Sequence, residues 1–227
     1  MVLADRAAGA RGVHMSPAQI RIEPCPKRIR AVVGGVTVVD STHARYVWRD
    51  RPYPAYYFPA GDVDAEYRSR SRAELDGLIS FRWSDMDHWF EEDEEVYVHA
   101  RDPHARVDIL PSSRAVSVEV DGVTVAQSSH PTLLFETGLP TRYYFAKTDV
   151  RLDLLVATDT VTACPYKGTA RYWSVRTGDT VHPDLAWGYD YPVPESIRIA
   201  GLICFYNERV DLTVDGERLE RPRTPFS

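Results

Sequence analysis

The stretch VGGVTVVDSTH at residues 33–43 returns 87 positions later as VDGVTVAQSSH at residues 120–130. The same offset carries Tyr56-Tyr57-Phe58 onto Tyr143-Tyr144-Phe145. Between residues 22 and 63 the register never slips, and 14 of the 42 positions are identical in both copies. Because chance does not hold a gapless register over such a length, we interpret the chain as a tandem duplication of one module.

Each copy begins with the pattern of a β-hairpin. Runs rich in Val and Ile flank Gly34-Gly35 in the first copy and Asp121-Gly122 in the second, and both dipeptides suit a two-residue type I′ turn. The 16 prolines leave little room for helices, and we expect at most one short helix, at Arg72–Ile79. The sequence therefore predicts an all-β fold of two tandem β-sheet modules, tent-like or sandwich-like, with pseudo-two-fold symmetry and little helix.

The repeat divides the chain into four parts. Residues 1–17 are rich in Ala, Gly and Arg and are expected to form a flexible N-terminal arm. The first β module is assigned to residues 18–104 and the second to residues 105–220. Residues 221–227 are expected to form a tail.

The first module is predicted to be the shorter copy. The residues that follow Trp83 resemble those that follow Trp187, which changes the offset from 87 to 104. We therefore expect the first copy to lack the segment around residues 162–174 and to carry the charged stretch 64–72 in its place. The acidic run at residues 91–95 is expected on a solvated loop or strand edge.

Composition argues against several classes of function. A net charge of −6 disfavours a nucleic-acid partner, because binding phosphate backbones requires clustered Lys and Arg. No run approaches 18 apolar residues, so no membrane-spanning segment is predicted. The three cysteines are widely spaced, which disfavours a disulfide framework and fits reduced thiols in a cytoplasm. We expect a cytoplasmic protein that is a monomer or a homodimer.

Several short motifs of the second copy occur together in a known family. They are Tyr143-Tyr144-Phe145, Asp149-Val150, Cys164-Pro165-Tyr166-Lys167-Gly168, Tyr172-Trp173, Ala186-Trp187 and Arg209-Val210-Asp211. Together they resemble the bacterial family catalogued as domain of unknown function 427, in its tandem form, over nearly the whole chain after residue 18. The resemblance implies an all-β module with two sheets leaning together like a tent. It implies no established activity.

Some descriptions of that family name a nucleotidyltransferase. Transfer of a nucleotidyl group needs carboxylates on one strand to hold magnesium. Asp149 and Asp153 are the nearest approach to such a pair, and four positions apart they share a face only imperfectly. No glycine-rich phosphate loop followed by a lysine is present either. We therefore do not predict nucleotidyl transfer.

The turn Cys164–Gly168 is the main candidate for chemistry, because its proline and glycine suit a tight turn that can direct side chains into a groove. Lys167 could bind a carboxylate or phosphate there, or form an imine if it is desolvated. The alternative is a surface Lys167 beside a buried Cys164. A nucleophilic Cys164 needs a nearby histidine or helix N-terminus, which the sequence does not reveal. The candidate catalytic residues are Lys167, Tyr166 and Cys164.

Aromatic side chains gather in the second copy. Tyr143 and Phe145 should face one side of their strand and Tyr144 the other, with residues 56–58 alternating in the same way. Core packing explains most of these residues, but aromatics beside a Tyr-Lys turn also suit a pocket for a flat or apolar small molecule. The candidate ligand-binding residues are Tyr57, Tyr144, Asp149, Trp173, Trp187 and Tyr189.

No metal and no cofactor are predicted. His43 and His130 occupy equivalent positions, which favours a structural role, and no histidine–carboxylate cluster has the spacing of metal ligands. We expect a small-molecule-binding protein or a cofactor-independent enzyme that works by acid–base or orientation chemistry, with one pocket lined by the second module. The alternative is a non-catalytic structural or interaction module. Whether the protein is an enzyme stays open at this point.

Overall fold

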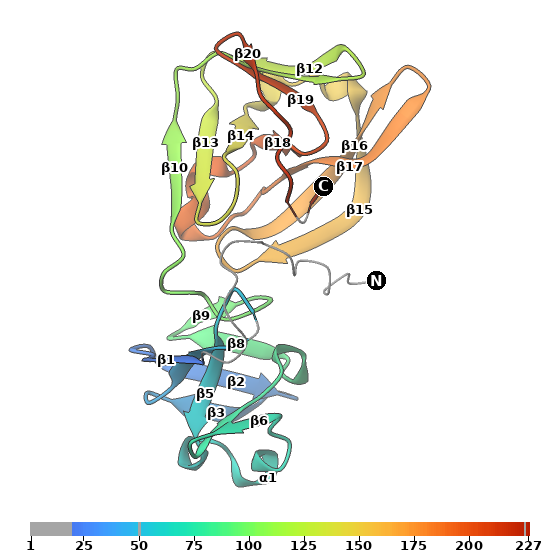
Figure 1. Cartoon of the computed structure of the whole chain (residues 1–227). Helices are drawn as coiled ribbons and strands as arrows, with labels where there is room; N and C mark the ends of the chain where they lie inside the picture. Colours follow the sequence, from blue (N-terminus) through green and yellow to red (C-terminus); the bar gives the residue numbers. More distant parts are fainter. Residues whose placement is uncertain (1–19, 50, 225) are drawn as a thin grey trace. The chain divides into compact units, whose positions relative to one another are not determined.

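The computed structural model describes residues 20–49, 51–224 and 226–227, and it is all-β, as predicted. The chain divides into two compact units. We call residues 20–103 the first unit and residues 104–227 the second unit (Figure 1). The predicted arm at residues 1–17 lies outside the described residues.

The first unit consists of two antiparallel sheets. A five-stranded sheet has the strand order β1-β4-β5-β7-β6, and a four-stranded sheet has the order β3-β2-β8-β9. The strands are β1 (Arg21–Pro24), β2 (Ile29–Val33), β3 (Val36–Ser41), β4 (Arg45–Trp48), β5 (Ala55–Pro59), β6 (Ala73–Leu75), β7 (Leu78–Ser80), β8 (His88–Glu91) and β9 (Glu94–Val96). The helical turns are η1 (Ala60–Asp62), α1 (Ala65–Arg68) and η2 (Trp83–Asp85).

The second unit has the same plan with a larger sheet. A seven-stranded sheet has the order β10-β13-β14-β18-β17-β16-β15, and a four-stranded sheet has the order β12-β11-β19-β20. The strands are β10 (Val107–Pro111), β11 (Val116–Val120), β12 (Val123–Ser128), β13 (Thr132–Glu136), β14 (Arg142–Phe145), β15 (Leu155–Cys164), β16 (Gly168–Thr177), β17 (Thr180–Gly188), β18 (Ile203–Phe205), β19 (Asp211–Val214) and β20 (Glu217–Arg218). The 3₁₀ turns are η3 (Lys147–Asp149), η4 (Leu152–Leu154) and η5 (Pro194–Ile199).

The opening hairpins of the two units have the same geometry. β2 pairs with β3 and shifts register after Ala31, and β11 pairs with β12 and shifts after Val118, 87 positions later. Gly35 and Gly122 close the two turns with φ angles of 78° and 77°, which only glycine adopts without strain. The predicted pair of type I′ hairpins is therefore confirmed, including a shared bulge that the sequence does not reveal.

Two insertions lengthen the second unit. β17 occupies the place beside β18 that β6 occupies beside β7, but the long strands β15 and β16 have no counterpart in the first unit (Figure 1). The second insertion is the loop of residues 189–202, which contains η5, whereas a two-residue turn joins β6 to β7. Residues 162–174, which were predicted to have no counterpart in the first copy, belong to β15, β16 and the turn between them, and the first unit has the stretch 64–72 with α1 between β5 and β6.

Two local predictions are wrong. Trp187 lies in β17, whereas Trp83 lies in η2 after β7, so the offset of 104 matches residues that are not equivalent. Two isolated tryptophans carry no information about strand pairing. Residues 72–79 form the hairpin β6–β7 and not a helix, because Asp76 and the glycine after it have φ angles of 50° and 77° and reverse the chain.

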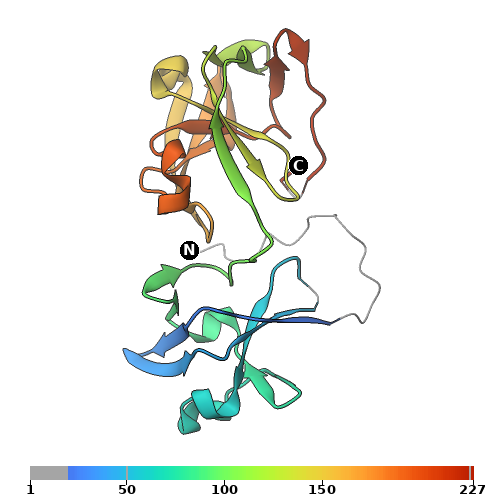
Figure 2. The ribbon, with the colours of Figure 1, turned by 90° about the vertical axis from the view of Figure 1, so that its left-hand side faces the viewer.

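The central strands β14 and β18 of the seven-stranded sheet are buried on both faces. Tyr143 and Phe145 face the core between the two sheets and Tyr144 faces the other side, as the alternation predicts. The loop 189–202 covers this other side, and Arg198 of η5 donates a hydrogen bond of 3.0 Å to a backbone carbonyl of β10 (Figure 2). The loop approaches so closely that a Cβ atom on Gly188 would lie 2.5 Å from the carbonyl oxygen of Leu202.

The core of the first unit contains a buried carboxylate. Glu91 is 4% exposed, accepts a hydrogen bond of 2.5 Å from the Tyr56 hydroxyl and pairs with the Lys27 ammonium at 2.5 Å. Burial, followed by the negative charge of Glu91, raises the pKa of Tyr56 well above its ordinary value. The prediction of a solvated acidic run is therefore wrong for Glu91, which pairs with Ile29 of β2 and points inward.

We predict that Glu91→Ala lowers the free energy of unfolding of the first unit by about 2 kcal/mol, because it leaves the buried Tyr56 hydroxyl without an acceptor. Urea unfolding followed by tryptophan fluorescence measures the change. Glu74→Ala, which removes an exposed carboxylate from β6, is the matched control and should stay within about 0.5 kcal/mol of the wild type. Equal effects of the two substitutions would contradict the role of Glu91.

Candidate functional site

The turn between β15 and β16 is held in a single conformation. The backbone amide of Lys167 donates to the carbonyl of Cys164 at 3.3 Å and closes the turn. Gly168 then continues with a φ angle of +96°, and a Cβ atom there would lie 3.3 Å from the backbone of Pro192. The loop 189–202 packs on this side, and its Ser196 hydroxyl donates to the carbonyl of Tyr166 at 2.8 Å. The inserted loop therefore fixes the inserted turn.

Lys167 is buried and ion-paired. Its side chain is 11% exposed, and its Nζ lies 2.5 Å from Oε2 of Glu136, whose side chain is 12% exposed. Glu136 is the last residue of β13, so the pair joins the turn to the opposite half of the sheet. The Cys164 thiol lies close enough to this ammonium to interact with it electrostatically. An ammonium, a carboxylate and a thiol thus meet at one poorly hydrated place in the second unit.

The environment keeps Lys167 protonated. Burial by itself lowers the pKa of its ammonium, but the negative charges of Cys164 and Glu136 and hydrogen bonds to both groups outweigh burial and raise the pKa above its ordinary value of 10.5. An amine nucleophile must be neutral, so the imine chemistry considered for Lys167 is disfavoured at neutral pH. The group can instead donate a proton or hold an anion.

Cys164 is the accessible thiol among the three cysteines. It is half-buried at the end of β15, whereas Cys25 and Cys204 are 3% and 0% exposed. Burial raises the pKa of Cys204 to about 12, which makes that thiol inert. Lys167 is the cation beside this thiol, where the sequence revealed neither a histidine nor a helix N-terminus.

A shallow hollow of about 300 Å³ borders this point. It lies at the β10–β13 edge of the large sheet and in the loop that follows β13. Its lining residues are Arg106, Asp108, Phe135, Glu136, Thr137, Leu139 and Thr141. Glu136 therefore belongs both to the wall of the hollow and to the ion pair. Lys167 does not line the hollow and lies behind this carboxylate.

Three of the predicted ligand-binding residues pack together on the covered face of the large sheet. Tyr144, Trp187 and Tyr189 are 1%, 7% and 5% exposed. The rings of Tyr144 and Trp187 meet edge to face with centroids 6.5 Å apart. Burial raises the pKa of the Tyr144 and Tyr189 hydroxyls well above their ordinary value. These side chains form a filled core beneath the loop 189–202.

The other three predicted ligand-binding residues lie apart from this group. Trp173 packs partly against the core between the two sheets. Asp149 is half-buried in η3, where its carboxylate accepts a hydrogen bond of 3.4 Å from Thr148. Tyr57 belongs to the first unit, and its hydroxyl accepts a hydrogen bond of 3.4 Å from Arg49. Of the predicted catalytic residues, Cys164 and Lys167 are in contact, while Tyr166 is half-buried in the same turn.

Sequence reasoning missed the carboxylates of the site. Glu136 ends an apolar strand run, which is the one local signal for it. A second missed pair, Arg142 with Glu208, is bidentate with two contacts of 2.7 Å and is almost completely buried. Arg142 also lies 5.5 Å from the ring of Trp187, so it supports the aromatic core. An arginine directly before Tyr143 in an otherwise apolar strand was the available signal.

Two findings concern the described residues as a whole. Within residues 20–49, 51–224 and 226–227, no group of three or more His, Cys, Asp or Glu side chains could hold a metal ion. No helix in the same residues is long and apolar enough to cross a membrane.

We predict that Lys167→Met lowers the free energy of unfolding of the second unit by about 3 kcal/mol, because it leaves Glu136 in a poorly hydrated place without its partner. The double variant Lys167→Met/Glu136→Leu should recover to within about 1 kcal/mol of the wild type, since a well-packed apolar pair can replace a buried ion pair. Urea unfolding of the four members of this cycle measures the coupling. Additive effects would contradict a direct interaction.

The contribution of Lys167 to the stability of the second unit depends on pH in a defined direction. Because the pKa of Lys167 is raised in the folded state, its contribution to stability is complete below its ordinary pKa of 10.5 and is lost as the pH rises through the folded pKa.

The comparisons with known proteins agree with the motifs. A family model described as domain of unknown function (DUF427) matches residues 21–75 and 108–216, which lie in the first and the second unit respectively. A comparison with curated proteins found no match. Because the matched residues make up well over half of the sequence, the chain belongs to the DUF427 family.

Proposed function

We propose that the second unit carries one small-molecule site, whose polar end is formed by Glu136, Lys167 and Cys164. The protein uses this site as a binder or as a cofactor-independent enzyme working by acid–base and orientation chemistry. The observation that carries the proposal is the convergence of two opposite charges and a thiol behind the wall of a hollow. Perturbed titratable groups beside a hollow are typical of functional sites.

The unequal units support one site per chain. We regard the units as tandem copies of one module, of which only the second has the turn with Lys167. At the position equivalent to Glu136 the first unit has Arg49, which hydrogen-bonds to Tyr57. Burying an ion pair costs desolvation energy that an apolar pair would avoid, so a purely structural reason for it is weak. The first unit then serves as scaffold.

Each group has a distinct task in the proposed site. Glu136 uses Oε2 for Lys167, and no interaction of its Oε1 occurs within the described part of the chain, so this oxygen can accept a hydrogen bond from a ligand in the hollow. The Lys167 ammonium can donate a proton to the ligand by way of Glu136, or it can stabilise negative charge that develops on the ligand. Cys164 is the candidate nucleophile, because it is the accessible thiol and lies beside Lys167. A small carbonyl or carboxylate compound that also carries a hydroxyl or amino group suits this set of groups, because that group can donate a hydrogen bond to Oε1 of Glu136.

A non-catalytic structural or interaction module is the alternative function. Its supporting observation is that Tyr144, Trp187 and Tyr189 lie in a filled core and line neither of the two hollows described for the second unit. Under this alternative, Lys167 and Glu136 only fasten the insertions to the sheet.

We predict that iodoacetamide alkylates Cys164 faster than Cys25 and Cys204, because it is the accessible thiol, and that Lys167→Met slows this reaction at pH 7 by about tenfold, because the attacking sulfur loses the cation beside it. Mass spectrometry of the individual cysteines measures the rates. Lys167→Arg should retain the rate, and Lys147→Met, which removes an exposed lysine of η3, is the matched control. An unchanged rate in Lys167→Met would remove the basis for a nucleophilic Cys164.

We also predict that a carbonyl or carboxylate compound raises the melting temperature of the protein in a screen of such compounds, and that Glu136→Gln abolishes the shift while the variant remains folded. Glu217→Gln, at an exposed position of β20, should keep the shift. Identical shifts in both variants would favour the structural alternative.

A further inference from the structure

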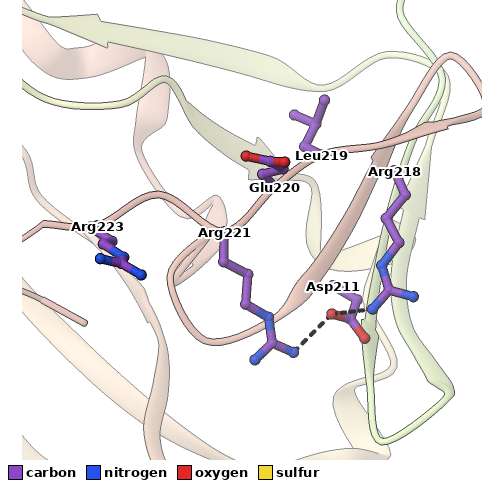
Figure 3. A pocket seen from close by; sticks show the side chains of 6 residues that line it. All are labelled: Asp211, Arg218, Leu219, Glu220, Arg221 and Arg223. Atoms are coloured by element: carbon purple, nitrogen blue, oxygen red, sulfur yellow. Dashed lines mark hydrogen bonds and ion pairs between the residues drawn. The ribbon is translucent and has the colours of Figure 1, made fainter.

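A second hollow lies on the same unit, remote in sequence from the Cys164 turn. It has a volume of about 590 Å³ and is formed by β19, β20 and the segment after β20 (Figure 3). Its lining residues are Asp211, Arg218, Leu219, Glu220, Arg221 and Arg223. Three arginines within six positions therefore border one concave surface.

One carboxylate holds two of the arginines in place. Nη2 of Arg218 and Nη2 of Arg221 lie 2.6 and 2.8 Å from the same Oδ1 of Asp211 (Figure 3). Nε of Arg221 also donates to the carbonyl of Val210 at 3.1 Å, which fixes the plane of this guanidinium. The two groups are oriented in advance, yet a single negative charge faces two positive charges.

The third arginine adds charge without a partner. Within the described residues, the Arg223 guanidinium takes part in no hydrogen bond or ion pair. The lining thus has three cations against the carboxylates of Asp211 and Glu220. This local positive excess occurs on a chain whose net charge is −6. A cluster of positively charged side chains on a protein of negative net charge is a favourable site for an anion.

The first unit shows that the hairpin itself does not require these charges. In the β19–β20 hairpin Thr213 pairs with Arg218, and in the equivalent β8–β9 hairpin Phe90 pairs with Glu95. There the Glu95 carboxylate lies 2.6 Å from the ring of His88. The two copies of one hairpin therefore have opposite charge at the same register position, so the strand pairing does not require an arginine at position 218.

We propose that this hollow binds the phosphate group of a small anionic ligand, with Arg218, Arg221 and Arg223 as the contacting residues. Guanidinium groups match the geometry of phosphate oxygens and bind them in a bidentate manner. The volume of the hollow exceeds that of a single phosphate group, so a diphosphate or a phosphate ester fits the space. This site is separate from the proposed carbonyl or carboxylate site.

Isothermal titration calorimetry of the full chain with inorganic pyrophosphate tests the proposal. We expect binding that Arg223→Ala weakens by about tenfold, since one charge-assisted contact is lost. Arg176→Ala is the matched control, because Arg176 is another exposed arginine of the second unit with no partner among the described residues. Absence of pyrophosphate binding by the wild type, or equal losses in both variants, would overturn the proposal.

Asp211→Asn gives a result that a merely structural role does not produce. The amide oxygen can still accept hydrogen bonds from Arg218 and Arg221 but no longer neutralises their charge, so pyrophosphate should bind about threefold more tightly. Unchanged or weaker binding would overturn the assignment of Arg218 and Arg221.

A phosphate group could belong to a soluble compound or to a lipid head group. Sedimentation with phosphatidylglycerol vesicles distinguishes these sources. Pyrophosphate binding without sedimentation supports a soluble ligand, whereas sedimentation that Arg223→Ala abolishes assigns the same hollow to a lipid phosphate. Sedimentation that Arg223→Ala leaves intact would contradict the site.

Discussion

The ion pair between Lys167 and Glu136 joins the turn between β15 and β16 to β13, at the other side of the large sheet of the second unit. Glu136 belongs to β13, which has its counterpart in β4, whereas Lys167 belongs to a turn that the first unit lacks. A buried charge is tolerated only with its partner, so neither residue is favourable without the other. The first unit agrees with this constraint, since it lacks the lysine turn and has Arg49 at the position of the glutamate.

The second insertion determines which groups reach solvent. The loop 189–202 closes over the outer face of the large sheet and packs against the turn that holds Lys167. Aromatic rings that could have lined a cleft are therefore used to build a core, as Tyr144 and Trp187 show. Of the residues considered for chemistry, Glu136 and Cys164 remain at the border of this core. The polar groups of the candidate site are thus placed by the packing of residues that are not themselves part of it.

Local patterns predicted the fold well and the site only in part. The hairpins at Gly34-Gly35 and Asp121-Gly122 follow from turn chemistry, and the alternation of Tyr143 and Tyr144 follows from the two-residue period of a strand. The ion pairs were not predictable, because their partners are 31 and 66 positions apart and meet only through strand order. The equivalence of β6 and β17 was missed for the same reason. Sequence similarity between single tryptophans does not report which strands are neighbours.

The close approach of the Leu202 carbonyl to Gly188 restricts which residues can replace this glycine. Any side chain at this position would collide with the Leu202 carbonyl, so a single methyl group decides whether the loop can remain closed. An open loop would expose several large rings at once, and exposed aromatic patches promote self-association. A substitution at this one position would therefore first be seen as a loss of solubility, well before any chemical role of the unit could be measured.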